Sequence, residues 1–378
     1  MGLCMQIDYS DYINLLTDFF KARNWEYNSC DGNVVFTKKY SNAVTRKIRS
    51  EYLLSDTLFY SKVSKSFAEL GIPSRISSSL ENKNSDTDFI IAGLQLADAD
   101  IKQEYVNHTS FYSLQPVVRL TKSDMGGQQD GMLTSFVNIC SVDINTSLEE
   151  YLKRVDQWIS IFSKLSLHTS GFKLTPKKIK NDRKYNGVPF YNGLKLKFSY
   201  KDTDIAVANL FTVDCAQGSI LVSDFGSSYE RVLGCINGDG NFFKPIYPNF
   251  QVLYGDYRQN DRLRTSVLMC LSGIAPGAKG NGQKLRDLIK EATVIIGGDK
   301  TRESIIYFYN YYVKFIKAKK SLAEVIYIIE AEMEQQKKKL ICGKNDNRFA
   351  KKSINDVCGD IILEQEILKR KRLITKSK

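Results

Sequence analysis

The sequence predicts an α+β fold, in which a mixed and mainly antiparallel sheet is flanked by helices and is followed by an all-α C-terminal region. Several short segments between residues 60 and 260 have the apolar periodicity of strands. Most of these segments follow one another through loops without a helix between each pair, which favours antiparallel pairing over a doubly wound parallel sheet. After Asp261 the apolar residues recur with a helical period almost throughout.

The first helix is expected in residues 7–25, because its apolar side chains share one face: Ile13, Leu16, Phe19 and Phe20. Either Ser10 or Asp11 is expected to be its N-cap. Residues 34–36, Val-Val-Phe, are typical of a short strand. The sequence therefore predicts a small N-terminal α/β appendage over residues 1–59.

The central domain is expected to span residues 60–260, with a helix at 53–70 leading into it. A second, long amphipathic helix is predicted at 148–167. The predicted strands, in chain order, are 89–92, 115–120, 133–142, 194–200, 205–213 and 219–222.

The C-terminal domain is expected to span residues 261–378 and to be helical and basic. Helical periodicity covers residues 261–335 and 353–372, and the chain ends in the basic stretch LKRKRLITKSK.

The composition excludes several classes of site. The net charge is +12, from 54 basic and 42 acidic residues, which suits a polyanionic partner but is also common in lysine-rich proteins without one. The 8 cysteines show no CxxC spacing and there are only 2 histidines, so a zinc site or a Ser-His-Asp triad is not expected. No run of about 18 apolar residues and no secretory signal is present, so we expect a cytoplasmic protein without a membrane span.

Two local patterns resemble known motifs but lack their context, and a third motif is absent. Residues 62–66, KVSKS, resemble a KMSKS nucleotide-binding loop. They lie in a predicted helix, however, and no HIGH-type partner motif precedes them. Residues 277–282, GAKGNG, lack the Gly-Lys-Ser/Thr ending of a phosphate-binding loop, and a loop between helices is the better interpretation. No GxGxxG pattern occurs near a strand–helix junction, so a dinucleotide-binding fold is not supported.

Two arginines carry more information. Arg119 ends the apolar strand QPVVRL and precedes a polar loop, residues 121–131, after which a second strand begins. An arginine on such a hairpin can bind a phosphate through charge-assisted hydrogen bonds. In SDFGSSYERV a strand is expected to end at Asp224, a glycine and two serines to form the turn, and a helix to bring Arg231 toward a nucleotide.

Together these segments resemble motifs 2 and 3 of the class II aminoacyl-tRNA synthetases, and specifically of alanyl-tRNA synthetase. The family's motif 3, approximately V-D-T-G-M-G-L-E-R, is similar to residues 223–231, SDFGSSYER, which keep the Asp, the first Gly, the Glu and the Arg. Other elements of that family resemble SSSL, AGLQ, QPVVR, ANLF, DRLR, SGIAP and GQKLR, in the same order along residues 77–286. The resemblance covers about residues 60–300.

The resemblance implies an enzyme that activates an amino acid with ATP and Mg²⁺ through an aminoacyl adenylate. Arg119 would bind the α-phosphate of ATP and stabilise the charge that develops there, and Arg231 would contact the far end of ATP. Phe136 would pack near adenine. Asp224 would pair with the α-ammonium group of a small amino acid, and Asn209 and Gly226 would complete that pocket.

The sequence also departs from the family. The histidines and the glutamate of its H-H-T-F-F-E-M segment are replaced in residues 132–138, MLTSFVN, and its P-S-N is replaced by Pro276-Gly277-Ala278. No editing domain or C-terminal oligomerisation domain is recognisable. The acceptor is therefore left open between tRNA, a small molecule and a carrier protein, and so are the amino acid and the oligomeric state. The alternatives are a non-catalytic synthetase paralogue that binds RNA or a protein, and an unrelated α+β fold.

Overall fold

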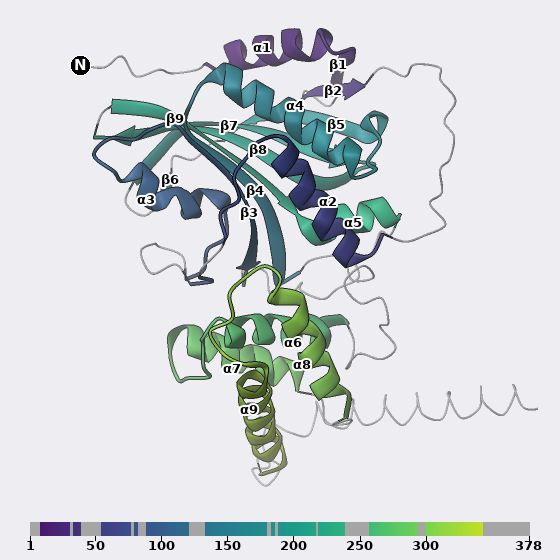
Figure 1. Cartoon of the computed structure of the whole chain (residues 1–378), viewed down its shortest axis with the longest axis vertical. Coiled ribbons are helices and arrows are strands. Elements are labelled where there is room, and N and C mark those ends of the chain that lie inside the picture. The colour runs from purple at the N-terminus through teal and green to yellow at the C-terminus, as the bar shows by residue number, and fades with distance from the viewer. Residues whose placement is uncertain are drawn as a thin grey trace, which may run out of the picture.

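The computed structural model describes residues 8–30, 33–38, 54–76, 79–81, 88–120, 133–179, 183–185, 188–216, 218–238, 257–293 and 299–342. In Figure 1 the sheet and its flanking helices form the upper part of the molecule, and helices α6–α9 form the lower part. This arrangement confirms the predicted fold class, an antiparallel sheet flanked by helices and followed by an all-α C-terminal region.

The strands form a 9-stranded sheet in the order β1-β2-β5-β7-β8-β9-β4-β3, with β6 paired to β7. Every pairing between these strands is antiparallel. The strand bounds are β1 Trp25–Cys30, β2 Asn33–Lys38, β3 Thr109–Val118, β4 Ser135–Thr146, β5 Phe172–Lys178, β6 Arg183–Tyr185, β7 Val188–Tyr200, β8 Thr203–Cys215 and β9 Gly218–Ser228.

The helical elements fall into a group around the sheet and a group after it. Around the sheet lie α1 Tyr9–Lys21, α2 Asp56–Glu69, α3 Asp98–Ile101, α4 Leu148–Lys164, α5 Tyr229–Asn237 and the short 3-10 helices η1 Gly93–Ala97 and η3 Thr169–Gly171. After it come α6 Tyr257–Leu271, α7 Gly280–Ala292, α8 Asp299–Tyr312 and α9 Leu322–Cys342.

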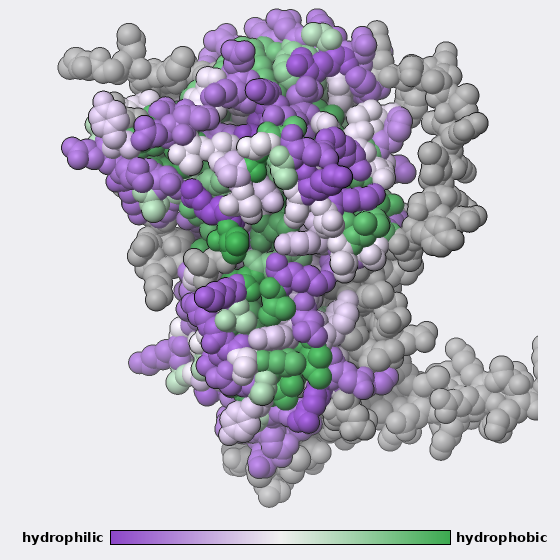
Figure 2. Space-filling model, viewed as in Figure 1, coloured by the Kyte–Doolittle hydropathy of each residue, from purple (hydrophilic) through white to green (hydrophobic). Residues whose placement is uncertain are grey.

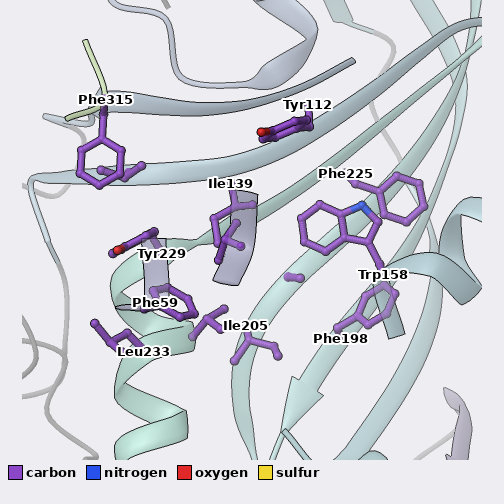
Figure 3. Close-up of a cluster of buried hydrophobic side chains, with 14 of the residues drawn as sticks. Phe59, Tyr112, Ile139, Trp158, Phe198, Ile205, Phe225, Tyr229, Leu233 and Phe315 are labelled. Atoms are coloured by element: carbon purple, nitrogen blue, oxygen red, sulfur yellow. The ribbon is translucent and has the colours of Figure 1, made fainter. Parts of the chain in front are cut away.

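One face of the sheet is covered by α4 with α2 and α5, and its core is rich in aromatic side chains (Figure 3). Trp158 of α4 stacks on Phe225 of β9 with ring centroids 5.8 Å apart, and its indole N–H donates a hydrogen bond to Ser141 Oγ at 2.8 Å. Phe67 of α2 stacks on Tyr112 of β3. Because an aromatic ring buries a large apolar area, these contacts make this face the main core of the sheet.

The opposite face is apolar at one end only, where η1 and α3 cover it. There Leu94, Ala97 and Ile101 pack against side chains of the sheet: Phe111, Val142, Ile144, Val213, Ile220 and Val222. Beyond this cluster the same face turns polar, and the candidate site described below lies there.

Helix α6 is almost wholly buried, since every residue from Asn260 to Leu271 is inaccessible to solvent. Its charged residues Asp261, Arg262 and Arg264 are each 0 % exposed. They contact the start of β4 and Glu230, and in this way they join the helical region to the sheet. In Figure 2, hydrophilic side chains cover most of the upper part, and hydrophobic ones gather where α6–α9 meet it and on the helices below.

Several elements match their predicted positions. The helix at 148–167 is α4, whose capping box is formed by Ser147 and Glu150, and the helix at 53–70 is α2. Residues 62–66 are helical within α2. Residues 34–36 belong to β2, which pairs with β5, so that β1 and β2 extend the sheet itself.

Other predictions were wrong in detail. Residues 89–92 form only an isolated bridge, Glu81 with Phe89, because the segment turns into η1. The N-cap of α1 is Asp8, since Ser10 and Asp11 already lie inside the helix. Helix α7 begins at Gly280, within the predicted loop 277–282. The predicted loop 121–131 and the helix at 353–372 lie outside the described residues.

The expected end of a strand at Asp224 was also wrong. Strand β9 continues through Gly226 to Ser228 and pairs with β4 on one side and β8 on the other. The small residues of SDFGSS suggest a turn locally, but Phe225 is 1 % exposed and packs in the core. Two neighbouring strands thus keep extended a segment whose own sequence favours a turn.

Within the described part of the chain, no helix combines the length and apolarity needed to cross a bilayer.

Candidate functional site

The predicted site residues lie on three neighbouring strands, just after the end of β3, and on helix α5. Asn209 of β8 is directly opposite Asp224 of β9, and Gly226 of β9 is opposite Cys140 of β4. Residues that face each other across antiparallel strands share a face, as do residues two apart along a strand. Asn209, Asp224, Gly226 and Phe136 therefore share one face, the one that η1 covers in part.

Arg119 follows the end of β3 and lies beside this face. Its backbone N–H donates to the carbonyl of Thr134, and its guanidinium lies over the ring of Phe136, 5.0 Å from the ring centroid. The Nη2 atom donates to the carbonyl of Ile91 at 3.0 Å. The side chain is exposed, so its cation is held in place by these contacts and still reaches solvent.

Asp224 is the most perturbed carboxyl group on this face. Burial raises its pKa to about 7, although a hydrogen bond from the backbone N–H of Leu94 and the positive charge of Arg119 both lower it. Its Oδ1 atom is buried and accepts no hydrogen bond in the structure. A buried acceptor without a donor is costly, so such an atom favours binding of a water molecule or of a ligand that supplies the donor.

Asn209 adds a second acceptor of the same kind. Its Oδ1 atom is also buried and has no hydrogen-bond partner in the structure. Since Asn209 and Asp224 are paired residues on adjacent strands, their oxygens are offered from neighbouring positions. Two adjacent acceptors, one of them a carboxylate, suit a ligand with several hydrogen-bond donors and a positive charge.

A close approach of η1 shapes the other side of Asp224. A Cβ atom on Gly93 would lie 2.8 Å from Cys140 Cβ and 2.9 Å from Asp224 Oδ1. Only glycine fits this approach without a shift, and it lets the next residue, Leu94, donate its N–H to Asp224. The contact between Arg119 and Ile91 holds the same segment from its other end.

Arg231 lies in the first turn of α5 and is half-buried. Its Nη1 atom donates to the carbonyl of Asp204 at 3.0 Å, and its charge helps to hold the pKa of Asp204 below the usual value, together with Lys197 and Ser199. The structure thus brings Arg119, Phe136, Asp224 and Asn209 to one face, and it connects Arg231 to the start of β8.

A groove of about 310 Å³ lies away from these residues, at the outer edge of β3. Residues of α2, of segments 74–76 and 112–114 and of segment 313–317 line it, and none of the predicted site residues does. Two of its three cations, Arg75 and Lys314, are ion-paired with Asp100 and Asp56. We therefore place the candidate site at Asp224, because two buried acceptors without a donor, those of Asp224 and Asn209, lie there on adjacent paired strands.

The described residues hold no group of three or more His, Cys, Asp or Glu side chains placed to bind a metal.

Sequence reasoning gave no role to three residues that shape the site. Gly93 lies in AGLQ, a segment noticed for its family resemblance only. Cys140 lies beside Asp224, and burial raises the pKa of its thiol above the usual value, which opposes formation of the thiolate. Glu230 was noticed as a motif residue only. Its contacts with Val137, Arg264 and Tyr311 join residues far apart in the sequence, so no local pattern predicts them.

No family model matches the chain, and no curated protein does. Among solved structures, it is similar to PylSc of Desulfitobacterium hafniense, a pyrrolysyl-tRNA synthetase, with 12% identity and a TM-score of 0.36 over 49% of this chain and 69% of that one. Another structure of pyrrolysyl-tRNA synthetase from Desulfitobacterium hafniense matches with 11% identity and a TM-score of 0.30, over 49% of this chain and 70% of that one.

Such identities concern the fold alone, and TM-scores of this size support no inference about the site. These neighbours are pyrrolysyl enzymes, so they give no support to the finer resemblance to alanyl-tRNA synthetase.

Proposed function

We propose that this protein activates a small amino acid with ATP, forming an aminoacyl adenylate that it passes to tRNA, to a small molecule or to a carrier protein. The observation that carries the proposal is the pair of buried acceptors on Asp224 and Asn209, on the same face as the cation of Arg119. A carboxylate and a guanidinium on one face complement the two charges of an amino acid and the phosphate that it attacks.

The chemistry follows from these charges. The α-ammonium group of the substrate would donate to Asp224 Oδ1 and Asn209 Oδ1, and Gly226 would leave room for the amino acid. A carboxylate oxygen of the amino acid attacks the α-phosphorus of ATP. A bond forms between that oxygen and the phosphorus, and the bond from the phosphorus to pyrophosphate breaks. Arg119 would stabilise the negative charge that develops on the α-phosphate.

The remaining residues would hold the nucleotide. Phe136 would pack against adenine while it supports Arg119, and Arg231 would contact the far end of ATP. Mg²⁺, bound to the phosphates, would offset their charge. Positioning and electrostatics dominate such a reaction, so no histidine base is required. The resemblance to alanyl-tRNA synthetase and the domain boundaries at residues 59/60 and 260/261 remain part of this proposal.

We place this activity in the cytoplasm, where ATP and amino acids are abundant. The free thiols of Cys140, Cys215, Cys235 and Cys270 support a reducing compartment.

The test is ATP–pyrophosphate exchange with a panel of amino acids, run with and without total tRNA. We expect one amino acid to drive exchange, and Arg119→Ala to abolish it. Arg23→Ala is a matched control, because Arg23 also lies over a phenylalanine ring, that of Phe19, but on α1. Exchange with no amino acid at all, or equal loss in both variants, would overturn the proposal.

A second candidate is a non-catalytic paralogue that binds RNA. Thr134 and Ser135, in the segment that departs from the family, are buried and hydrogen-bonded to Asp261 and Thr265 of α6. They therefore serve the packing of α6 and are not free for a substrate. Salt-sensitive RNA binding without exchange would favour this candidate.

A further inference from the structure

Strands β4 and β9 separate at a defined point. Their pairing runs up to Asn138 opposite Ser228, after which β9 ends and the chain turns into α5. Strand β4 extends further, to Ser135, and there it keeps only β3 as a neighbour. The backbone of residues 135–137 therefore needs hydrogen-bond partners that β9 does not supply.

Two side chains take the place of the missing strand. Both carboxylate oxygens of Glu230 lie 3.1 Å from the backbone N–H of Val137, which donates to them. Arg264 of α6 donates from Nη1 to the carbonyl of Ser135 at 2.8 Å, and it also forms an ion pair with Glu230. Donor and acceptor of the β4 backbone are thus satisfied by one buried ion pair that comes from α5 and α6.

Helix α8 completes the cluster. The hydroxyl of Tyr311 donates to Glu230 Oε1 at 3.1 Å, and the hydroxyl of Tyr312 donates to Ser135 Oγ at 2.8 Å. Glu230 and Arg264 are both 0 % exposed. Because these side chains are buried, they bond to one another rather than to water, and the cluster holds its elements in register.

The residues that the cluster holds are neighbours of predicted site residues. Val137 follows Phe136 on β4, and Glu230 precedes Arg231 on α5. Glu230 thus links the two elements that carry the predicted ATP contacts to each other and to the helical region, in addition to the contacts of Asp261 and Arg262 with Thr134.

We propose that Glu230 is a positioning residue, through which α6 and α8 hold β4 and α5 in the arrangement that binds ATP. The effect on ATP binding rests on the proposed function, whereas the coupling of β4, α5, α6 and α8 through Glu230 does not. Glu230 itself would touch neither substrate, because its carboxylate is occupied by Val137, Arg264 and Tyr311.

The test measures ATP binding and amino acid binding separately. ATP, and the amino acid that drives exchange, are each titrated calorimetrically against the full chain carrying Glu230→Gln or the milder Tyr311→Phe. We expect the dissociation constant for ATP to rise about tenfold in Glu230→Gln and less in Tyr311→Phe. That for the amino acid should change less than twofold, because Asp224 and Asn209 lie in the paired part of β9 and β8, away from residues 135–137. Tyr309→Phe is the matched control, since its hydroxyl bonds only to the carbonyl of Lys320 among its described contacts.

Hydrogen exchange of the same variants without ligand tests the coupling directly. Faster exchange confined to peptides covering 135–138 and 229–237 is expected, with β7 and β8 still protected. Unchanged exchange there, or equal weakening of both ligands, would overturn the proposal. A wild-type chain that binds no ATP would instead contradict the proposed function, and the exchange pattern would then decide whether the coupling exists.

Discussion

Asp224 and Asn209 face each other across β9 and β8, and each offers a buried side-chain oxygen that accepts no hydrogen bond in the structure. Such a pair is unfavourable for the unliganded fold, because buried acceptors lose water without gaining a donor. The pair is therefore expected to lower stability and to raise affinity for a donor-rich cation. This expectation leads to two predictions about Asp224.

The first concerns stability. The pKa of Asp224 is raised from its ordinary value of 3.8 to about 7, so the folded protein binds this proton more tightly than the unfolded chain does. The stabilisation is complete below pH 4 and is lost as the pH rises through 7, by up to about 4 kcal/mol. Asp224→Asn cannot ionise, and we expect its Tm to exceed that of the wild type much more at pH 8 than at pH 4.5.

Thermal denaturation in buffers across this range measures the difference. Asp202→Asn is the control, because Asp202 is exposed and pairs only with Lys173 among its described contacts. A Tm difference for Asp224→Asn that does not change with pH would show that Asp224 is not a perturbed acid.

The second concerns ligand binding. A substrate ammonium binds the ionised form of Asp224, whose pKa is about 7 in the free protein. The apparent dissociation constant of the activated amino acid should rise about tenfold between pH 8 and pH 6, since less of the protein is then ionised. Calorimetric titration at several pH values measures this, with ATP titrated in the same buffers as the reference. A flat profile for the amino acid would contradict the assignment.

The third concerns the approach of η1 to the sheet. Gly93→Ala places a Cβ atom 2.8 Å from Cys140 Cβ, where both groups sit in packed structure. We expect a loss of stability of about 1–3 kcal/mol and weaker binding of the amino acid, because η1 must move and take the N–H of Leu94 away from Asp224. Urea unfolding measures the loss.

Gly226→Ala provides the comparison on the same face. Its Cβ atom would lie 3.3 Å from Asn138 Oδ1, a contact that a small rotation relieves. Equal destabilisation by the two substitutions would show that the approach of η1 is not specific.

The fourth concerns the buried pair of Asp143 and Arg154. Arg154 donates to Asp143 from Nε at 3.0 Å and from Nη2 at 2.5 Å. Burial opposes ionisation of Asp143, but the hydrogen bonds and charge of Arg154 outweigh it and hold its pKa below the usual value. Arg154→Met leaves the carboxylate without its cation and should cost about 3–5 kcal/mol at pH 7.

The double variant Asp143→Asn with Arg154→Met should recover much of this loss in urea unfolding, because no buried charge remains. The contribution of the pair is present above the unfolded pKa of Asp143, near 4, and disappears as the pH falls through its lower folded pKa. Arg23→Met, which breaks the exposed pair with Asp156, should cost less than about 1 kcal/mol. Similar losses for the two arginines would contradict this account.

Local pattern was sufficient for much of the fold. Apolar periodicity located α2, α4, β7 and β8, and short loops between strands indicated antiparallel pairing, because both signals are carried by neighbours in sequence. Asp224 and Arg119 could each be chosen as site residues from motif resemblance, and they lie on the face where Asn209 and Phe136 also lie. The roles given to them remain predictions.

Elements that depend on distant partners were not predictable in this way. Helix α6 carries Arg262 and Arg264 at positions that look exposed by pattern, yet both are wholly buried because Thr134, Ser135 and Glu230 satisfy them. The role of Gly93 depends on a helix and a strand meeting at Cys140, far away in sequence.

The sequence alone determined the class of the fold and the residue types on which a charged substrate would depend, because periodicity and charge belong to the chain itself. Only the tertiary structure decided that β9 continues past Asp224 to Ser228, with Asn209 beside it. Two flanking strands supply more hydrogen bonds to SDFGSS than a local turn does, and burial of Phe225 adds to them. The same extension places the acceptor of Asp224 in the protein interior, where burial shifts its pKa to about 7.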